Sequence, residues 1–298
     1  DGLTGRGWAL FLSYQNRHTM FEKHSFSDYQ LEHLEKALDQ LYQPVQCYTY
    51  PPGYGQSLLG NLENMRKWIP ERYYWVTDIR KKAIIWQAGV AENLGYSAES
   101  LSLPFSIHLI HPDFREIICW YALQLYTLSQ NIRYCLKGIK ITYQVEFPVQ
   151  RHDNTYVIVR QYAYPFAFDQ KGRMIQNLNQ FQIKDRYDGQ LPDIRFSLQP
   201  TDEHAIMNDL METIHKNRSD WLVDSFPLLT DREKHLLKVL DFMPANKKKV
   251  HELMQVSKHT IKTHKKHILR KAKKQFPSLN LDFEMTIKLY QKLGLLDY

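Results

Sequence analysis

Cationic side chains dominate one stretch near the carboxyl end of this 298-residue chain. Residues 247–274 hold eleven lysines and arginines against a single acid, Glu252. At about 100° per residue, a helix beginning after Ser257 would gather basic and polar side chains on one face. They are Lys258, His259, Lys262, Thr263, Lys266 and Arg270. Lysine donates to guanine O6 and N7 or to phosphate, and threonine contacts a thymine methyl, so this face suits the major groove of duplex DNA.

The net charge follows the same division of the chain. The whole sequence carries +7, whereas Thr230–Tyr298 alone carries +9, which leaves −2 for the residues before it. A near-neutral body joined to a small basic tail is typical of a protein that binds a polyanion.

Local signals predict the helices that must position this cationic face. Thr230 and Glu233 have the spacing of a capping box, which begins a helix, and Ser257 is a good N-cap for another. We expect a short helix over 247–254 that buries Val250 and Leu253, a turn at Gln255-Val256 and a third helix ending near Lys274. Ile261, His264, Ile268 and Ala272 share the opposite side of that third helix with Ser257 and would be buried. A short helix, a tight turn and a longer basic helix form a helix-turn-helix arrangement.

Two sequence motifs in this tail resemble the LuxR-type (GerE-like) DNA-binding domain. They are Leu229-Thr230-x-Arg232-Glu233 and Val256-Ser257-x-x-Thr260-Ile261-Lys262-x-His264-x-x-x-Ile268-x-x-Lys271. The resemblance implies that Lys262, Thr263 and Lys266 face the groove. It also implies a homodimer, RNA polymerase as a further partner, and a fourth helix at Phe283–Leu293 that supports dimerisation through Met285, Leu289 and Leu293. The segment Lys273–Leu281 is longer than in that family and includes Pro277.

Other chemistry in the tail is less well supported. His251, His259, His264 and His267 cluster there, but neighbouring lysines repel a divalent cation and no cysteine or carboxylate completes a metal site. The chain also has no nucleophile motif of the Ser/His/Asp or Cys/His kind and no phosphate-binding glycine loop. We therefore expect neither catalytic residues nor a metal site, and no enzyme activity.

The middle of the chain changes to a strand pattern. Strands are expected at 73–77 and 83–86, a helix at 113–129, and three longer strands at 138–151, 156–168 and 173–184. Ile139, Ile141, Tyr143, Val145 and Phe147 alternate along one face. The pattern predicts an α+β fold: a five-stranded antiparallel sheet with helices on one side, followed by an all-α tail of four helices.

Four motifs in this region resemble a PAS sensor domain. They are Tyr74-Trp75-Val76-Thr77-Asp78, Ile84-Ile85-Trp86, Leu94-Gly95-Tyr96-Ser97-Ala98-Glu99 and Ile110-His111-Pro112-Asp113. The resemblance implies a pocket or partner surface between the concave sheet face and the helices. No cysteine stands in a flavin-binding motif, whereas His108 and His111 leave haem open as a cofactor. A small apolar ligand, or none, is the other reading.

The chain is thus divided into a helical extension (1–70), a PAS-like domain (71–186), a connector helix (200–226) and a LuxR-type helix-turn-helix domain (227–298). Weak heptads in the connector fit a dimeric coiled coil or packing on the sheet.

A transcriptional regulator that senses a signal is the leading hypothesis. An acyl-homoserine-lactone receptor using Trp68, Tyr73 and Asp78 is an alternative, as is a haem- or metal-dependent sensor. Three widely spaced cysteines and the lack of a long apolar run favour the cytoplasm over a membrane.

Overall fold

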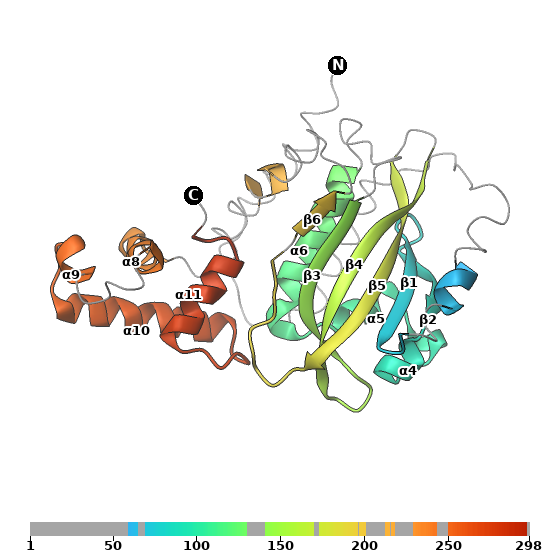
Figure 1. The fold of residues 1–298 in the computed structure, drawn as a ribbon, viewed down its shortest axis with the longest axis horizontal. Coiled ribbons are helices and arrows are strands. Elements are labelled where there is room, and N and C mark those ends of the chain that lie inside the picture. The colour runs from blue at the N-terminus through green and yellow to red at the C-terminus, as the bar shows by residue number, and fades with distance from the viewer. Residues whose placement is uncertain are drawn as a thin grey trace, which may run out of the picture.

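A computed structural model gives the fold of the chain (Figure 1). It describes residues 59–64, 69–129, 141–169, 173–195, 197–200, 212–214, 216–217, 229–242 and 250–296. Most of the expected 1–70 extension and of the 200–226 connector lies outside these residues. The described part of the extension includes a short helix at 59–64, and the connector is helical at 212–214 and 216–217.

One antiparallel sheet forms the centre of the molecule. Its strands are β1 (Arg72–Asp78), β2 (Ala83–Ala88), β3 (Ile141–Gln150), β4 (Tyr156–Phe168), β5 (Met174–Arg186) and β6 (Ser197–Pro200). The order across the sheet is β2-β1-β5-β4-β3-β6. The first and last of the five expected strands, β1 and β5, are therefore hydrogen-bonded neighbours inside the sheet. The sixth strand was not expected. It pairs with β3 along the edge of the sheet, beyond the predicted end of the domain at 186.

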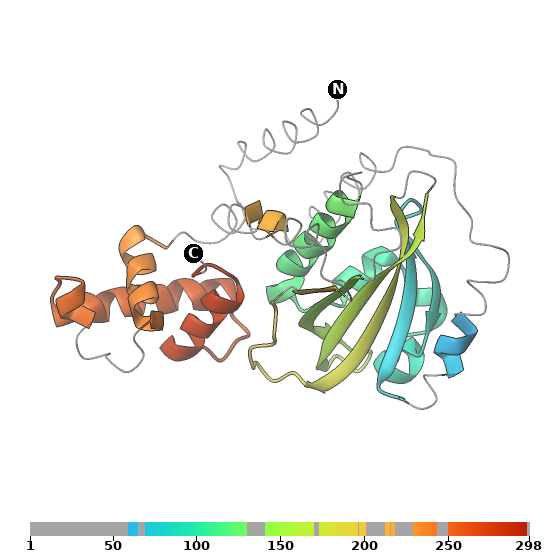
Figure 2. The ribbon, with the colours of Figure 1, turned by 45° about the horizontal axis from the view of Figure 1, so that its top comes forward.

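Helices cover one face of this sheet, as the strand pattern predicts. They are α4 (Val90–Leu94), the 3₁₀ turn η1 (Ala98–Ser100), α5 (Leu103–His108) and α6 (Pro112–Ser129). Figure 2 shows α6 running along the sheet on that side. Its buried stripe includes Phe114, Ile117 and Tyr121, which meet the alternating Tyr143, Val145 and Phe147 of β3 in a continuous core.

The described part of the tail consists of helices joined by short turns and loops. It contains α8 (Asp231–Phe242), α9 (Val250–Leu253), α10 (Lys258–Gln275) and α11 (Phe283–Lys292). The two expected caps are present: the Glu233 amide donates to Thr230 Oγ1 at 3.3 Å, and the Thr260 amide donates to Ser257 Oγ at 3.0 Å. The predicted fold class, an antiparallel sheet with helices followed by a helical tail, is confirmed. No described helix is long and apolar enough to span a bilayer.

Candidate functional site

Helix α10 separates its buried and charged side chains as the sequence predicts. Ile261, Ile268 and Ala272 are buried against the tail core, and His264 is half-buried. On the other side Lys258, His259, Lys262, Lys266 and Arg270 are exposed. Thr263 is half-buried, and its hydroxyl donates to the His259 carbonyl at 3.1 Å. We call these last six residues the α10 surface.

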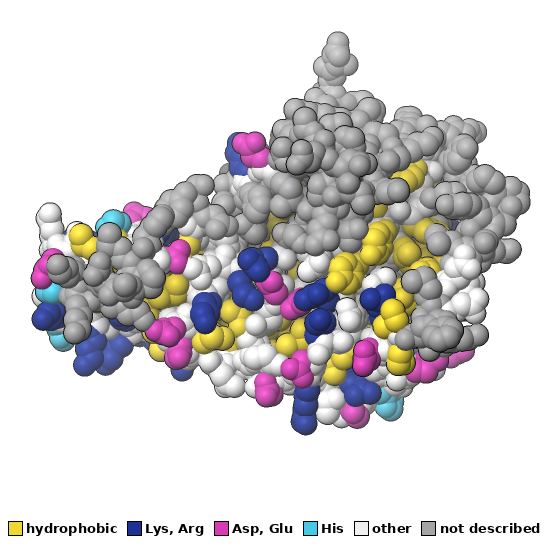
Figure 3. Space-filling model, viewed as in Figure 1, with side chains coloured by type: hydrophobic (Ala, Val, Ile, Leu, Met, Phe, Trp, Pro, Cys, Tyr) yellow, Lys and Arg dark blue, Asp and Glu magenta, His cyan; other side chains and the backbone are white. Residues whose placement is uncertain are grey.

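Within the described part of the chain, no ion pair joins a cation of the α10 surface to a carboxylate. Helix α10 contains no acidic residue. Figure 3 shows lysine and arginine side chains gathered at the end of the molecule formed by α9 and α10. Cations free of carboxylate partners can donate to bases and phosphates without first breaking an ion pair. The DNA-contacting role of these residues stays a prediction.

A buried ion pair fixes α10 relative to α8. Lys271 Nζ lies 2.6 Å from Glu233 Oε2, and Glu233 is only 2% exposed. The same carboxylate accepts hydrogen bonds from the Thr230 amide and hydroxyl. Burial alone would raise the pKa of Glu233, but the bonds from Lys271 and Thr230 reverse this, so the pKa lies below its usual value. The capping box was visible in the sequence, whereas its link to Lys271, 38 residues away, was not.

Helix α9 and the following turn partly match the prediction. Gln255 adopts a left-handed conformation (φ 52°), which makes the tight turn, and Val250 is buried. Leu253 was expected to be buried with Val250 but is 51% exposed. Residues three apart lie about 60° from each other around a helix, and the tail core reaches only the Val250 side of α9.

The three residues expected to support dimerisation occupy different environments. Leu289 and Leu293 are fully buried within the tail domain itself, and Met285 is half-buried. Leu289 and Leu293 hold α11 in the core, so in this structure they cannot present their side chains to a second copy. Met285 alone of the three has accessible surface, and its part in a dimer stays a prediction.

A cavity of about 110 Å³ lies between α6 and the concave face of the sheet. The walls are mainly apolar and aromatic. Helix α6 contributes Ile118, Cys119, Tyr121, Ala122, Leu125 and Tyr126 to one side, and the strands contribute Trp75, Val145, Phe147, Ala163 and Phe181 to the other. Enclosure by apolar side chains with a few polar groups is typical of a small-molecule site.

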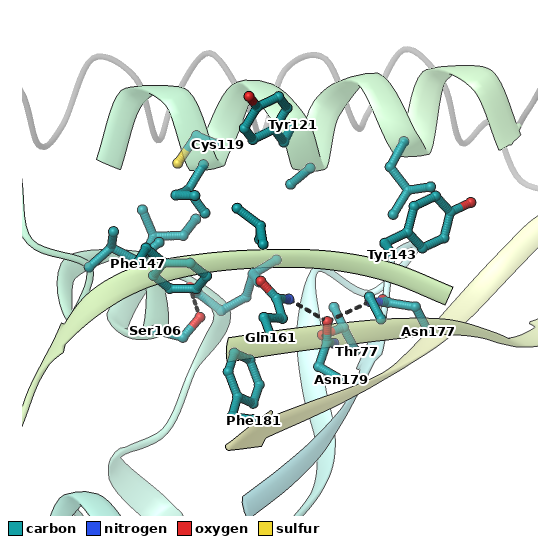
Figure 4. A pocket seen from close by; sticks show the side chains of 18 of the residues that line it. Thr77, Ser106, Cys119, Tyr121, Tyr143, Phe147, Gln161, Asn177, Asn179 and Phe181 are labelled. Carbon is teal, nitrogen blue, oxygen red and sulfur yellow. Dashed lines mark hydrogen bonds between the residues drawn. The ribbon is translucent and has the colours of Figure 1, made fainter. Parts of the chain in front are cut away.

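The carboxamide side chains that line the cavity all come from the sheet side (Figure 4). Asn179 Oδ1 accepts from Gln161 Nε2 at 2.8 Å and from Asn177 Nδ2 at 3.0 Å, while Asn179 Nδ2 donates to Thr77 Oγ1 at 3.3 Å. A carboxamide has two N–H donors and two acceptor lone pairs, so this cluster keeps hydrogen-bonding capacity for a ligand. Among the lining residues that the structure describes, none is a lysine, arginine, histidine, aspartate or glutamate. The cluster was missed in the sequence because neighbouring strands bring it together.

The cavity does not fit the cofactors considered from the sequence. Neither His108 nor His111 lines it. A ring nitrogen of His108 bonds the Pro104 carbonyl at 2.9 Å, and His111 Nδ1 accepts from the Asp113 amide at 3.2 Å. Burial raises the pKa of the Cys119 thiol to about 12, so it is not a ready nucleophile. Among the described residues, no group of three or more potential ligands could hold a metal ion.

The residues weighed for a lactone pocket are likewise not assembled here. Tyr73 is fully buried and does not line the cavity, and Trp68 lies outside the described residues. Asp78 instead accepts hydrogen bonds from Gln176 Nε2 and the Lys81 amide. That carboxylate shapes the β1–β2 turn rather than the cavity.

Comparison with known proteins gives no assignment. No family model matches the chain, and no curated protein matches it. One similar solved structure is the N-terminal domain of a diguanylate cyclase with a PAS/PAC sensor from Marinobacter aquaeolei (13% identity, 38% of this chain and 94% of that chain, TM-score 0.30). A phage VqmA–DPO complex (13%, 82% and 91%, 0.28) and a Vibrio cholera VqmA–ligand–DNA complex (14%, 82% and 90%, 0.26) are also similar. Likenesses of this size place the chain in no family.

Proposed function

We propose that the chain is a transcriptional regulator that binds duplex DNA as a homodimer through the α10 surface and senses a small molecule in the cavity beside α6. The observation that carries the proposal is the arrangement of α10. One side of the helix is buried in the tail core, and the other presents five exposed basic or imidazole side chains. An α-helix fits the major groove, which is about 12 Å wide.

The electrostatic balance supports the DNA-binding half of the proposal. The tail from Thr230 onward carries +9 against −2 for the rest, so attraction to a polyanion is concentrated where α10 lies. Since each phosphate contact releases a counterion, affinity should fall steeply with salt.

Removing two central cations tests this half. Lys262→Ala with Lys266→Ala should weaken binding to a duplex by ~10–1,000-fold and flatten the slope of log K against log salt by about 2, because each lost phosphate contact contributes about 0.9. Titrations of a labelled duplex, selected from a random-sequence pool by the wild-type protein, between 50 and 200 mM salt measure both quantities.

The matched control is Lys274→Ala with Lys288→Ala. These two lysines are exposed and lie outside the α10 surface, so the control removes the same charge from the same domain. It should change affinity far less. Equal losses in the two variants would mean that only net charge matters, and undiminished binding by the first variant would refute a role for α10.

The sensing half rests on the chemistry of the cavity walls. Because no ionisable carboxylate or basic side chain lines the cavity, an ionised ligand would lose its hydration without gaining a counter-charge. We infer a small neutral ligand with an apolar body and one polar edge for the Gln161–Asn179 cluster. Benzamide and benzoate are a matched pair of neutral and anionic probes. Stabilisation of the protein by benzoate in preference to benzamide, measured as a shift in melting temperature, would contradict this choice.

A further inference from the structure

The connection between α10 and α11 lies against the sheet domain. In this connection, residues 276–281, Phe276, Leu279 and Leu281 are buried. Ser278 and Asn280 lie between them and bond to the sheet domain. We call residues 276–281 the docking loop; they fall in the segment that is longer than in LuxR-type domains.

The docking loop bonds to the sheet domain through both backbone and side chains. The Ser278 amide and hydroxyl both donate to Asp113 Oδ2, at 2.9 and 2.6 Å. Since that hydroxyl gives its proton to Asp113, its oxygen accepts from the Tyr187 hydroxyl at 2.8 Å. The Asn280 amide donates to the Gly189 carbonyl at 3.0 Å, and its side chain donates to the Asp188 carbonyl at 3.2 Å.

The sheet domain has a glycine where the docking loop packs closely against it. Gly189 has φ 95°, and a Cβ there would lie 2.8 Å from both the Ser278 carbonyl and Asn280 Nδ2. Nearby, Lys292 of α11 donates to the Pro192 carbonyl at 3.2 Å and lies 3.4 Å from the Asp193 carboxylate. A hydrogen bond from Arg195, with the charge of Lys292, lowers the pKa of Asp193 to about 2, so its negative charge persists at neutral pH. Two separate elements of the tail therefore engage one surface.

Helix α6 joins this contact to the cavity. Asp113 stands in its first turn, while Ile118, Cys119 and Ala122 further along line the cavity. The Phe114 ring lies 6.0 Å from that of Phe276 in the docking loop. A change in the position of α6 therefore acts on the cavity wall and on the docking loop together.

We infer that Asp113 and residues 187–193 form an internal docking surface for the tail domain, and that α6 transmits the state of the cavity through it to the α10 surface. This inference rests on the proposed function, because its outcome is a change in DNA binding. The contact between the tail and the sheet domain can be tested without DNA. The docked arrangement leaves the α10 surface exposed, so docking sets the orientation of α10 rather than covering it.

Amide hydrogen exchange of the full-length protein tests the contact. The Ser278 and Asn280 amides donate across the domains, so exchange in residues 276–281 should accelerate at least ~10-fold when docking is broken. Two variants break it from opposite sides: Gly189→Ala from the sheet domain, and Ser278→Ala with Asn280→Ala and Lys292→Ala from the tail. Gly60→Ala is the glycine control, because nothing lies within 4 Å of a Cβ there.

Exchange in α8 and the buried part of α10 should be unchanged in these variants, which shows that the tail still folds. Unaltered exchange at 276–281 in the triple variant would overturn the docking surface. Acceleration that occurs with Gly189→Ala but not with the triple variant would also overturn the docking surface, since that result reports strain at a left-handed residue rather than lost contact.

A double-mutant cycle tests transmission. Ala163→Leu fills the cavity from β4, opposite α6. It should change the DNA dissociation constant by ~3-fold or more in the wild-type background and by less than ~1.5-fold in the triple variant. Equal changes in both backgrounds, or no change in the first, would overturn transmission. Loss of DNA binding in every protein, wild type included, would refute the proposed function while the exchange result still decides the contact.

Discussion

Glu116 is a single side chain on α6 whose protonation should set a pH dependence. Burial raises its pKa from 4.5 to about 7. Between pH 4.5 and about 7 the folded protein holds a proton on Glu116 that the unfolded chain has lost. The stability that this bound proton contributes is therefore complete below about pH 4.5 and is lost as the pH rises through 7. Glu116→Gln should therefore be about 1–3 kcal/mol more stable than wild type at pH 8 and nearly equal at pH 4. Urea unfolding at both pH values measures this, with the exposed Glu92→Gln as control.

The burial or exposure of a side chain was predicted best where helical or strand spacing alone decides which face it occupies. The exposed cations of α10 follow from helical spacing and the buried pattern beside them. The environments of Leu253, Leu289 and Leu293 differed from expectation because burial depends on what packs against each helix, which helical spacing alone does not give. Gln161 and Asn179 could not be paired from the sequence. Their contact depends on the β4–β5 register, in which Gln161 faces Phe181 and Asn179 faces Ala163.

At the scale of elements, the pairing of α8 with α10 depends on Glu233. Removing this carboxylate breaks the ion pair with the Lys271 ammonium, which is 24% exposed, and deletes the cap of α8. Glu233→Ala should cost about 3–5 kcal/mol and Thr230→Ala about 1 kcal/mol. Urea denaturation of the full-length protein measures both. A cost for Glu233→Ala no larger than that for Thr230→Ala would show that the ion pair contributes little.

Most elements could be located from the sequence because their signals are local. The β4 strand has its expected bounds, and β5 extends two residues beyond the expected end at 184. Strand β6 was missed since four residues ending in proline carry no alternating pattern, and proline is tolerated there because the strand lies at the sheet edge. The docking loop was noticed only for its length, because its partners lie about 90 to 165 residues earlier in the chain.

At the scale of the whole molecule, docking should couple the unfolding of the tail to that of the sheet domain. The triple variant Ser278→Ala, Asn280→Ala, Lys292→Ala removes three side chains that bond across the contact, each contributing about 1 kcal/mol. Calorimetry should show the tail transition of this variant roughly 12–24 °C lower than in wild type, because a domain of this size shifts by about 4–8 °C per kcal/mol. Coincident melting in the two proteins would argue against coupling.

Helix α10 is held near its carboxyl end, and the α10 surface extends to its opposite end at Lys258. Its 18 residues span about 27 Å, and the docking loop begins directly after Gln275. The helix therefore works as a lever arm: a tilt of about 5° at the anchored end would carry its tip by about 2 Å, a sizeable part of the 3.4 Å rise between base pairs. In the proposed DNA-bound homodimer, a displacement too small to reshape the cavity visibly would thus move two such tips, one from each subunit, out of step with the spacing of their half-sites.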